Sequence, residues 1–302
     1  MNFASTNRLA YSFVLFGAVL WGTIGLYVDE LSAAGFTALQ IVTLRVVCAA
    51  VMLVIFLAVK NPNLLKIDFK DSFSFIGTGI FSIVFFNWCY FTAIEEVSLS
   101  VAVILLYTGP AFVVIFSRIF FKEPLTSLKV TALILTITGC AFVTGAVPVG
   151  GQNISLYGLL VGLGSGFGYA LYSVFGKHAL KKYEPMTVIT YTFLFAAGVM
   201  LPVNSPTIDV DQLDSLRIWL IILGLGFFPT ALAYWLYTVG LSKIESSRAS
   251  ITATVEPLVA VLIGVAIFNE TLTFYQLSGM LLILISVVLI QLKRVVLMKK
   301  VR

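Results

Sequence analysis

Apolar residues occur along this chain in runs of about 20, and short polar loops separate the runs. A helix of that length crosses the hydrocarbon core of a bilayer and satisfies its own backbone hydrogen bonds there. The pattern therefore predicts an all-α polytopic membrane protein with ten transmembrane helices. The predicted spans are residues 9–28, 36–59, 72–94, 98–118, 126–146, 155–178, 186–202, 216–240, 248–267 and 273–292.

The second half of the chain repeats the first half. Residues 77–126 align without a gap to residues 224–273 with 14 identities in 50 positions, where apolar composition alone would give about 5. We therefore predict a first five-helix repeat at 1–147 and a second at 148–302. Because five is odd, the second repeat enters the membrane from the opposite side, and the repeats are inverted. Inverted repeats are typical of transporters that open to the two sides in turn, with a site near the midplane.

The composition agrees with a polytopic membrane protein, and the positions of the basic residues indicate its orientation in the membrane. The sequence is 60% hydrophobic and 11% charged, whereas soluble domains carry about 25% charged residues. With both termini in the cytoplasm, 17 of the 19 Lys and Arg residues fall in inside segments, as the positive-inside rule expects. We predict an integral protein of the plasma (inner) membrane. The net charge of +5 is explained by these segments and does not indicate nucleic acid as a partner.

One carboxylate, Glu256, lies near the middle of the ninth predicted span. A charge at that depth costs about 2.5–3.5 kcal/mol on insertion scales, so it faces protein or water rather than lipid. Thr252 lies one turn away on the same small, polar helical face. Glu256 would bind a proton or a cationic group of a substrate. Alternatively, it is a structural carboxylate bonded to a helix end or to Arg45.

Arg45 lies about ten residues into the second span, too deep for its side chain to reach the interface easily. A guanidinium there would bind a carboxylate or phosphate of a substrate. The structural alternative is that Arg45 pairs with an acidic side chain or caps backbone carbonyls.

Aromatic residues are dense in several spans, and buried tyrosines must find partners for their hydroxyls. We predict an aromatic cavity that binds an apolar or cationic solute through stacking or cation–π contact. The alternative is that these residues form interfacial belts and packing, and we assign Tyr27, Tyr90 and Tyr237 to the belts because they lie near predicted span ends. The candidate cavity residues are Trp21, Asn87, Trp88, Tyr107, Tyr169 and Tyr234.

Glycine and proline predict local packing. Gly158, Gly162 and Gly166 are spaced four apart and predict a face of close helix packing. Pro229 leaves the carbonyl of Leu225 without its helical donor, which predicts a kink used in gating or in packing. The fifth and tenth spans have the fewest polar residues, and we expect them at the periphery or in a dimer contact.

Several motifs, in order along nearly the whole chain, resemble the EamA family of the drug/metabolite transporter superfamily. The resemblance implies a ten-helix secondary transporter of small metabolites, often amino acids or drugs and often exported. Two features depart from the family pattern: the second repeat has no arginine matching Arg45, and Asn269 replaces the usual glycine. Because the family places an arginine here across unlike substrates, the structural interpretation of Arg45 is favoured. The motifs are Trp21-Gly22, Arg45, Pro110, Lys122-Glu123-Pro124-Leu125, Glu256-Pro257 and Asn269-Glu270-Thr271-Leu272.

These observations predict a secondary or facilitative transporter of a small organic metabolite, an amino acid or a related amine or drug-like solute. The alternatives are an organic-anion transporter anchored by Arg45 and a non-transporting membrane receptor or scaffold. The sequence has no Walker A, HExxH or GxSxG motif, so we expect no metal, no cofactor and no enzymatic activity. Protons are the candidate coupling ion, and we expect a monomer or a homodimer.

Overall fold

The computed structural model describes residues 3–145, 155–204, 207–268 and 271–299, and every regular element in these ranges is helical. Nine helical segments are long and apolar enough to cross a membrane, and α8, of 17 residues, is a shorter apolar helix at the place of the fifth predicted span. The all-α polytopic prediction is confirmed. The predicted boundary between the repeats, at 147/148, lies outside the described residues.

The helices follow the predicted order, and several spans consist of consecutive helical pieces. The first half contains α1 (Phe3–Gly22), α2 (Ile24–Ala33), α3 (Ala38–Lys60), η1 (Pro62–Leu65), η2 (Phe69–Asp71), α4 (Ser72–Ile76), η3 (Gly77–Val84), α5 (Phe85–Glu96), α6 (Leu99–Leu106), α7 (Gly109–Phe121) and α8 (Ser127–Val143). The second half contains α9 (Leu156–Ala179), α10 (Pro185–Asn204), η5 (Val210–Leu213), α11 (Leu216–Gly226), η6 (Phe227–Leu232), α12 (Ala233–Lys243), α13 (Ser246–Ala253), α14 (Glu256–Phe268) and α15 (Phe274–Lys299).

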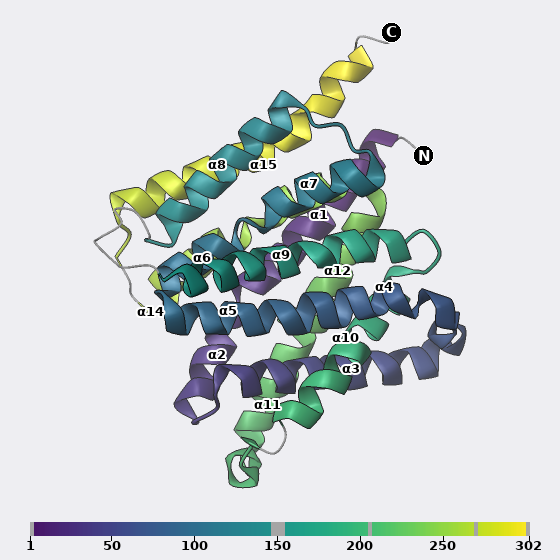
Figure 1. Ribbon diagram of the computed structural model, residues 1–302, viewed down its shortest axis with the longest axis vertical. Helices are drawn as coiled ribbons and strands as arrows, with labels where there is room; N and C mark the ends of the chain where they lie inside the picture. The colour runs from purple at the N-terminus through teal and green to yellow at the C-terminus, as the bar shows by residue number, and fades with distance from the viewer. Residues whose placement is uncertain (1–2, 146–154, 205–206, 269–270, 300–302) are drawn as a thin grey trace.

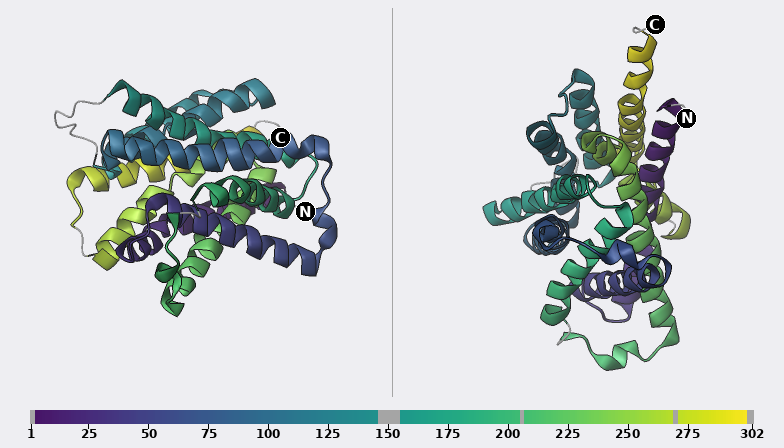
Figure 2. Two further views of the ribbon diagram at one scale, coloured as in Figure 1. Left: turned by 60° about the horizontal axis from the view of Figure 1, so that its bottom comes forward. Right: turned by 90° about the vertical axis from the view of Figure 1, so that its right-hand side faces the viewer.

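The most extensive helix pairs each join one helix of the first half to one of the second half. α1 packs on α12, α5 on α9, α3 on α10 and α8 on α15. If each helix is replaced by its counterpart in the other repeat, the pair α1–α12 becomes α9–α5, and the pairs α3–α10 and α8–α15 stay the same. This is the pattern of a pseudo-two-fold axis. In Figure 1, α8 and α15 run side by side along one edge of the bundle, as expected for the fifth and tenth spans. Figure 2 shows that the start of α1 and the end of α15 lie near one another.

The fourth and ninth spans are interrupted at matching positions. α6 ends at Leu106 and α7 begins at Gly109; α13 ends at Ala253 and α14 begins at Glu256. Both interruptions precede a proline, which cannot donate the backbone hydrogen bond that a continuous helix requires. Broken helices of this kind are tolerated in membranes where they line a cavity. The break makes Glu256 the first residue of a half-helix.

The third and eighth spans each contain a wider, π-helical segment at matching positions, η3 and η6. In η6, the hydroxyl of Thr230 donates to the carbonyl of Leu225 at 2.7 Å. This is the carbonyl that Pro229 was predicted to leave free. The side chain therefore repairs the backbone hydrogen bonding locally, and the span continues as α12.

Glycines on α9 permit the close packing that their spacing predicts. A Cβ atom on Gly162 would lie 2.3 Å from the side chain of Leu105. One on Gly166 would lie 2.8 Å from the carbonyl oxygen of Leu105 and 3.1 Å from the amide nitrogen of Gly109. Gly166 therefore lets α9 approach the break between α6 and α7, because no side chain separates the backbones.

We predict that Gly166→Ala destabilises the fold by about 1–3 kcal/mol, because the new methyl group overlaps backbone atoms that cannot move aside. Gly198→Ala on α10 is the matched control, since nothing lies within 4 Å of its new Cβ. That change should be neutral or slightly stabilising because alanine favours helices. The measurement is the melting temperature of each purified variant in detergent. Equal melting temperatures for the two variants would contradict this account of the packing.

Candidate functional site

A cavity of about 520 Å³ extends from the middle of the bundle to one end. At that end it is lined by Ala38 at the start of α3, Leu99 at the start of α6 and Thr144 at the end of α8. We call this the acidic end because α2 carries Asp29 and Glu30 there and α5 ends there with Glu95 and Glu96. We call the opposite end, with Lys60, Lys66, Lys122 and Lys181, the basic end. The volume lies within the range of small-molecule sites, about 300–1,000 Å³.

Arg45 of α3 and Glu256 of α14 both line this cavity at its inner part. No carboxylate oxygen of the described residues lies within 4.0 Å of the Arg45 guanidinium, so the two charges share one space without forming an ion pair. The Arg45 side chain is buried, and its Nε has no hydrogen-bond partner among these residues. A buried guanidinium without a hydrogen-bond partner is costly, so this group is suited to bind an anionic group in the cavity.

The predicted site residues fall into two groups. Trp21, Asn87 and Tyr107 line the cavity together with Arg45 and Glu256. Asn87 is held by a 2.7 Å hydrogen bond from its Nδ2 to the carbonyl of Ile83. The indole Nε1 of Trp21 is buried and has no partner among the described residues. The inner part of the cavity thus combines two opposite charges, an unused N–H donor and aromatic surface.

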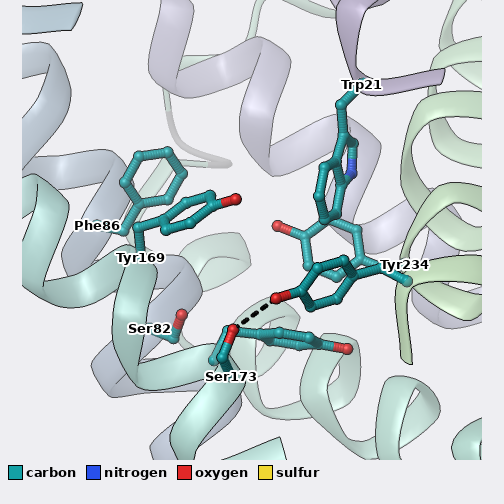
Figure 3. A pocket seen from close by; sticks show the side chains of 8 residues that line it. Trp21, Ser82, Phe86, Tyr169, Ser173 and Tyr234 are labelled. Atoms are coloured by element: carbon teal, nitrogen blue, oxygen red, sulfur yellow. Dashed lines mark hydrogen bonds between the residues drawn. The ribbon is translucent and has the colours of Figure 1, made fainter. Parts of the chain in front are cut away.

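Tyr169 and Tyr234 lie deeper, around a second cavity of about 20 Å³, which is enough for about one water molecule. It shares Trp21 and Phe86 with the larger cavity. Figure 3 shows Phe86 and Tyr169 on one side, facing Trp21 and Tyr234 on the other, with the hydrogen bond of Ser173 to a tyrosine hydroxyl marked. Aromatic side chains thus fill most of the space between Trp21 and Ser173, and they leave room for about one water molecule.

Four predictions about individual residues need correction or relocation. The assignment of Tyr90 and Tyr237 to interfacial belts is wrong: Tyr90 lines the large cavity, and Tyr237 is 1% exposed and bonded to Ser173 at 2.7 Å. Their helical segments extend to Glu96 and Lys243, so both rings lie deeper than predicted. Trp88 is 49% exposed on the outside of α5 and lines neither cavity, and Thr252 is buried beside neither cavity.

The basic end is closed by a polar cluster that the sequence analysis did not predict. Glu123 follows α7 and reaches the first turn of α13, where its carboxylate accepts hydrogen bonds from the amide nitrogens of Ser246 at 2.7 Å and Ser247 at 3.3 Å. It also accepts one from the Ser247 hydroxyl. A carboxylate at a helix N-terminus is favoured by the unpaired amides and the helix dipole.

Lys129 links this contact to the loop before α13. Its Nζ lies 3.3 Å from Glu123 and 3.0 Å from Glu245, and the side chain is 2% exposed. Desolvation by burial raises the pKa of Glu245, but hydrogen bonds from Arg248 and Lys129 outweigh it, and the pKa lies below its ordinary value. We call Glu123, Lys129, Glu245, Ser246 and Ser247 the closing cluster. The repeated motif with Glu123 and Glu270 was the one sequence signal that could have indicated it.

Residues at equivalent positions of the two repeats differ in exposure. Leu99 and Val103 line the large cavity, whereas their counterparts Ser246 and Ser250 are fully buried. The buried side also holds hydroxyls of Ser117, Ser246 and Thr252 that have no hydrogen-bond partner among the described residues. The bundle is therefore open in one half and closed in the related half.

The model of the EamA-like transporter family matches residues 8–145 and 156–292. The chain belongs to this family. An uncharacterized transporter of Archaeoglobus fulgidus is 30% identical to this EamA chain over 288 residues, covering 93% of the chain and 96% of the relative. The threonine/homoserine exporter RhtA of Escherichia coli is 28% identical over 199 residues, covering 64% and 63%. A crystal structure has the same fold, with a TM-score of 0.78 at 17% identity, covering 93% and 95%.

Family membership establishes this EamA protein as an integral membrane transporter, as the sequence motifs indicated. The large cavity is open toward the acidic end, and the closing cluster joins α7, α8 and α13 at the basic end.

We predict that Glu123→Ala destabilises the protein by about 3 kcal/mol, because it removes one partner of buried Lys129 and leaves two amides of α13 unpaired. Glu30→Ala is the control, since the Glu30–Arg217 pair is exposed and should contribute about 0–1 kcal/mol. Melting temperatures in detergent compare the two variants. If Glu30→Ala cost as much as Glu123→Ala, the closing cluster would not have the stabilising role described.

Proposed function

We propose that this chain transports an amino acid or a related amine across the plasma membrane by alternating access, with the solute held between Arg45 and Glu256. The observation that carries the proposal is the pair of opposite charges in one cavity with no ion pair between them. The α-carboxylate of a zwitterion would bind the guanidinium of Arg45, and its ammonium would bind Glu256. The name of the relative RhtA, a threonine/homoserine exporter, supports an amino-acid solute.

Two further groups in the cavity suit this solute. The indole N–H of Trp21 and the Nε of Arg45 are unused donors, and a carboxylate supplies acceptors for both. Tyr107 and the apolar lining around it would contact the solute side chain. Because an unsatisfied buried donor costs about 1–3 kcal/mol, filling both adds to the affinity for a carboxylate-bearing solute.

The distribution of basic residues supports an orientation. The basic end carries the Lys-rich loops and would face the cytoplasm, so the large cavity would face outward. Export then requires the closing cluster to separate and the acidic end to close. The counterparts of the cavity residues in the second repeat, Ser246 and Ser250 among them, would line the inward-facing path.

A proton is the proposed coupling ion. When the cavity faces outward, a proton that binds the carboxylate of Glu256 removes the charge that holds the ammonium, and the amino acid leaves. The proton would then be carried inward and released from Glu256 on the cytoplasmic side, where the carboxylate can bind the next ammonium. One group thereby binds either the proton or the solute, which is the requirement for exchange between them.

We predict that charge substitutions separate the two ends of the solute. The matched panel has three ligands. Threonine carries both charged groups, 1-amino-2-propanol carries only the amine, and 3-hydroxybutyrate carries only the carboxylate. Glu256→Gln should weaken the binding of threonine and of 1-amino-2-propanol at least tenfold and leave the binding of 3-hydroxybutyrate unchanged. Arg45→Gln should weaken the binding of threonine and of 3-hydroxybutyrate and leave the binding of 1-amino-2-propanol unchanged. Binding is measured by calorimetry or thermal shift on the purified protein.

Trp88→Phe is the control, because that side chain lies outside both cavities, and it should bind all three ligands normally. Binding of the acid alone, with a loss confined to Arg45→Gln, would establish the organic-anion alternative. Unchanged binding of every ligand by both charge variants would overturn the proposed site.

We predict reciprocal accessibility of Val103 and Ser250, which occupy equivalent positions in the two repeats. In a background without Cys48, Cys89 and Cys140, Val103→Cys should react with an impermeant maleimide from outside, and Ser250→Cys should react slowly from either side. Adding Glu123→Gln, which removes a charge from the closing cluster, should speed reaction of Ser250→Cys from the cytoplasmic side and slow that of Val103→Cys. Unchanged rates at both positions would contradict alternating access through these halves.

A further inference from the structure

A third cavity, of about 380 Å³, lies at the basic end between the ends of α7, α9 and α12. It shares no residue with the two cavities of the proposed transport path. Three lysines contribute to its lining and no carboxylate does. The lining consists of Phe120, Phe121, Lys122, Lys177, Leu180, Lys181 and Ser242.

Two of the three ammonium groups are held by contacts that do not neutralise them, and the third is exposed. The Nζ of Lys177 donates to the carbonyls of Leu241 at 2.6 Å and Ile244 at 2.7 Å. Lys181 lies over the ring of Phe121, 5.5 Å from its centroid, in a cation–π contact. Lys122 is exposed and has a left-handed backbone, φ 55°, which places it at the rim where the chain leaves α7.

Two of the carboxylates near this cavity in sequence are already engaged, and a third, Glu184, is exposed and lies outside its lining. Glu123 binds the first turn of α13 and Lys129, and Glu245 binds Lys129 and Arg248. Their negative charge is therefore shared with two cations, Lys129 of the closing cluster and Arg248. The cavity retains an excess of positive charge, which favours an anion.

An apolar strip leads from this cavity along α7 into the membrane. The rings of Phe112, Phe116 and Phe120 follow one another at centroid distances of 6.2 Å, and Phe167 of α9 packs edge-on against the first two. Phe120 is 63% exposed. A soluble anion would need only the lysines, whereas a lipid would use the lysines and the strip together.

We propose that this cavity binds the phosphate headgroup of an anionic phospholipid, with an acyl chain lying along Phe116 and Phe120. Basic pockets between transmembrane helices at the membrane surface recognise such headgroups. Lys122 and Lys181 would contact the phosphate, and Lys177 would supply a fixed positive charge behind them. This site is independent of the solute that the protein carries.

The test uses full-length protein in neutral detergent, titrated with phosphatidylglycerol or with phosphatidylcholine of the same acyl chains. Native mass spectrometry counts the bound lipid, and thermal shift gives the affinity. Phosphatidylglycerol should bind and raise the melting temperature, and phosphatidylcholine should not. The double variant Lys122→Gln, Lys181→Gln should weaken the binding of phosphatidylglycerol about 30-fold, since each lysine near a membrane surface contributes about a factor of five to the affinity.

Lys66→Gln with Lys70→Gln is the matched control, because both are exposed lysines at the basic end outside the cavity. Phe120→Ala should weaken the binding of phosphatidylglycerol but not the binding of a soluble anion. If inorganic phosphate or glycerophosphoglycerol raised the melting temperature as much as phosphatidylglycerol does, the cavity would be a site for a soluble anion, and the proposal of a lipid ligand would be overturned. Unchanged phosphatidylglycerol affinity in the cavity double variant, or an equal loss in the control, would overturn the site.

Discussion

Two opposite charges kept apart inside an apolar bundle are the constraint on which the rest of this structure depends. Arg45 and Glu256 would collapse into an ion pair if their helices could approach, and the cavity between them would close. The break before α14 fixes one charge at a helix start, and α3 holds the other within a continuous helix. Glycine faces and paired helices make the surrounding bundle stiff enough to maintain that separation.

The duplicated scaffold supports a site that is not itself duplicated. Glu256 stands where the first repeat has Gly109, and Arg45 has no arginine counterpart. The helix breaks and π-helical segments, in contrast, recur in both repeats. In the proposed cycle, conformational change and recognition therefore rest on different residues. The repeated backbone features would permit exchange between two forms, and the two unrepeated charges would orient the solute.

Sequence patterns predicted the features that depend on many residues. The positions of the spans and the glycine face of α9 follow from periodicity, which averages over many side chains. Single side chains were harder to place, because a rotation of one helix by a fraction of a turn moves a residue from a cavity to lipid. Trp88 and its neighbour Asn87 show this: one faces outward and the other lines the cavity. The closing cluster joins residues 123 positions apart, a contact that no local pattern encodes.

The closed half contains buried hydroxyl groups that lack hydrogen-bond partners in the part of the chain that the structure describes. Ser117, Ser246 and Thr252 keep hydroxyls without partners among the described residues, each at a cost of about 1–3 kcal/mol. Opening that half would hydrate them, and this gain offsets part of the loss when the closing cluster separates. This offset lowers the free energy needed to open the closed half. The smaller that free energy, the weaker the preference for one form that a ligand needs in order to shift the populations.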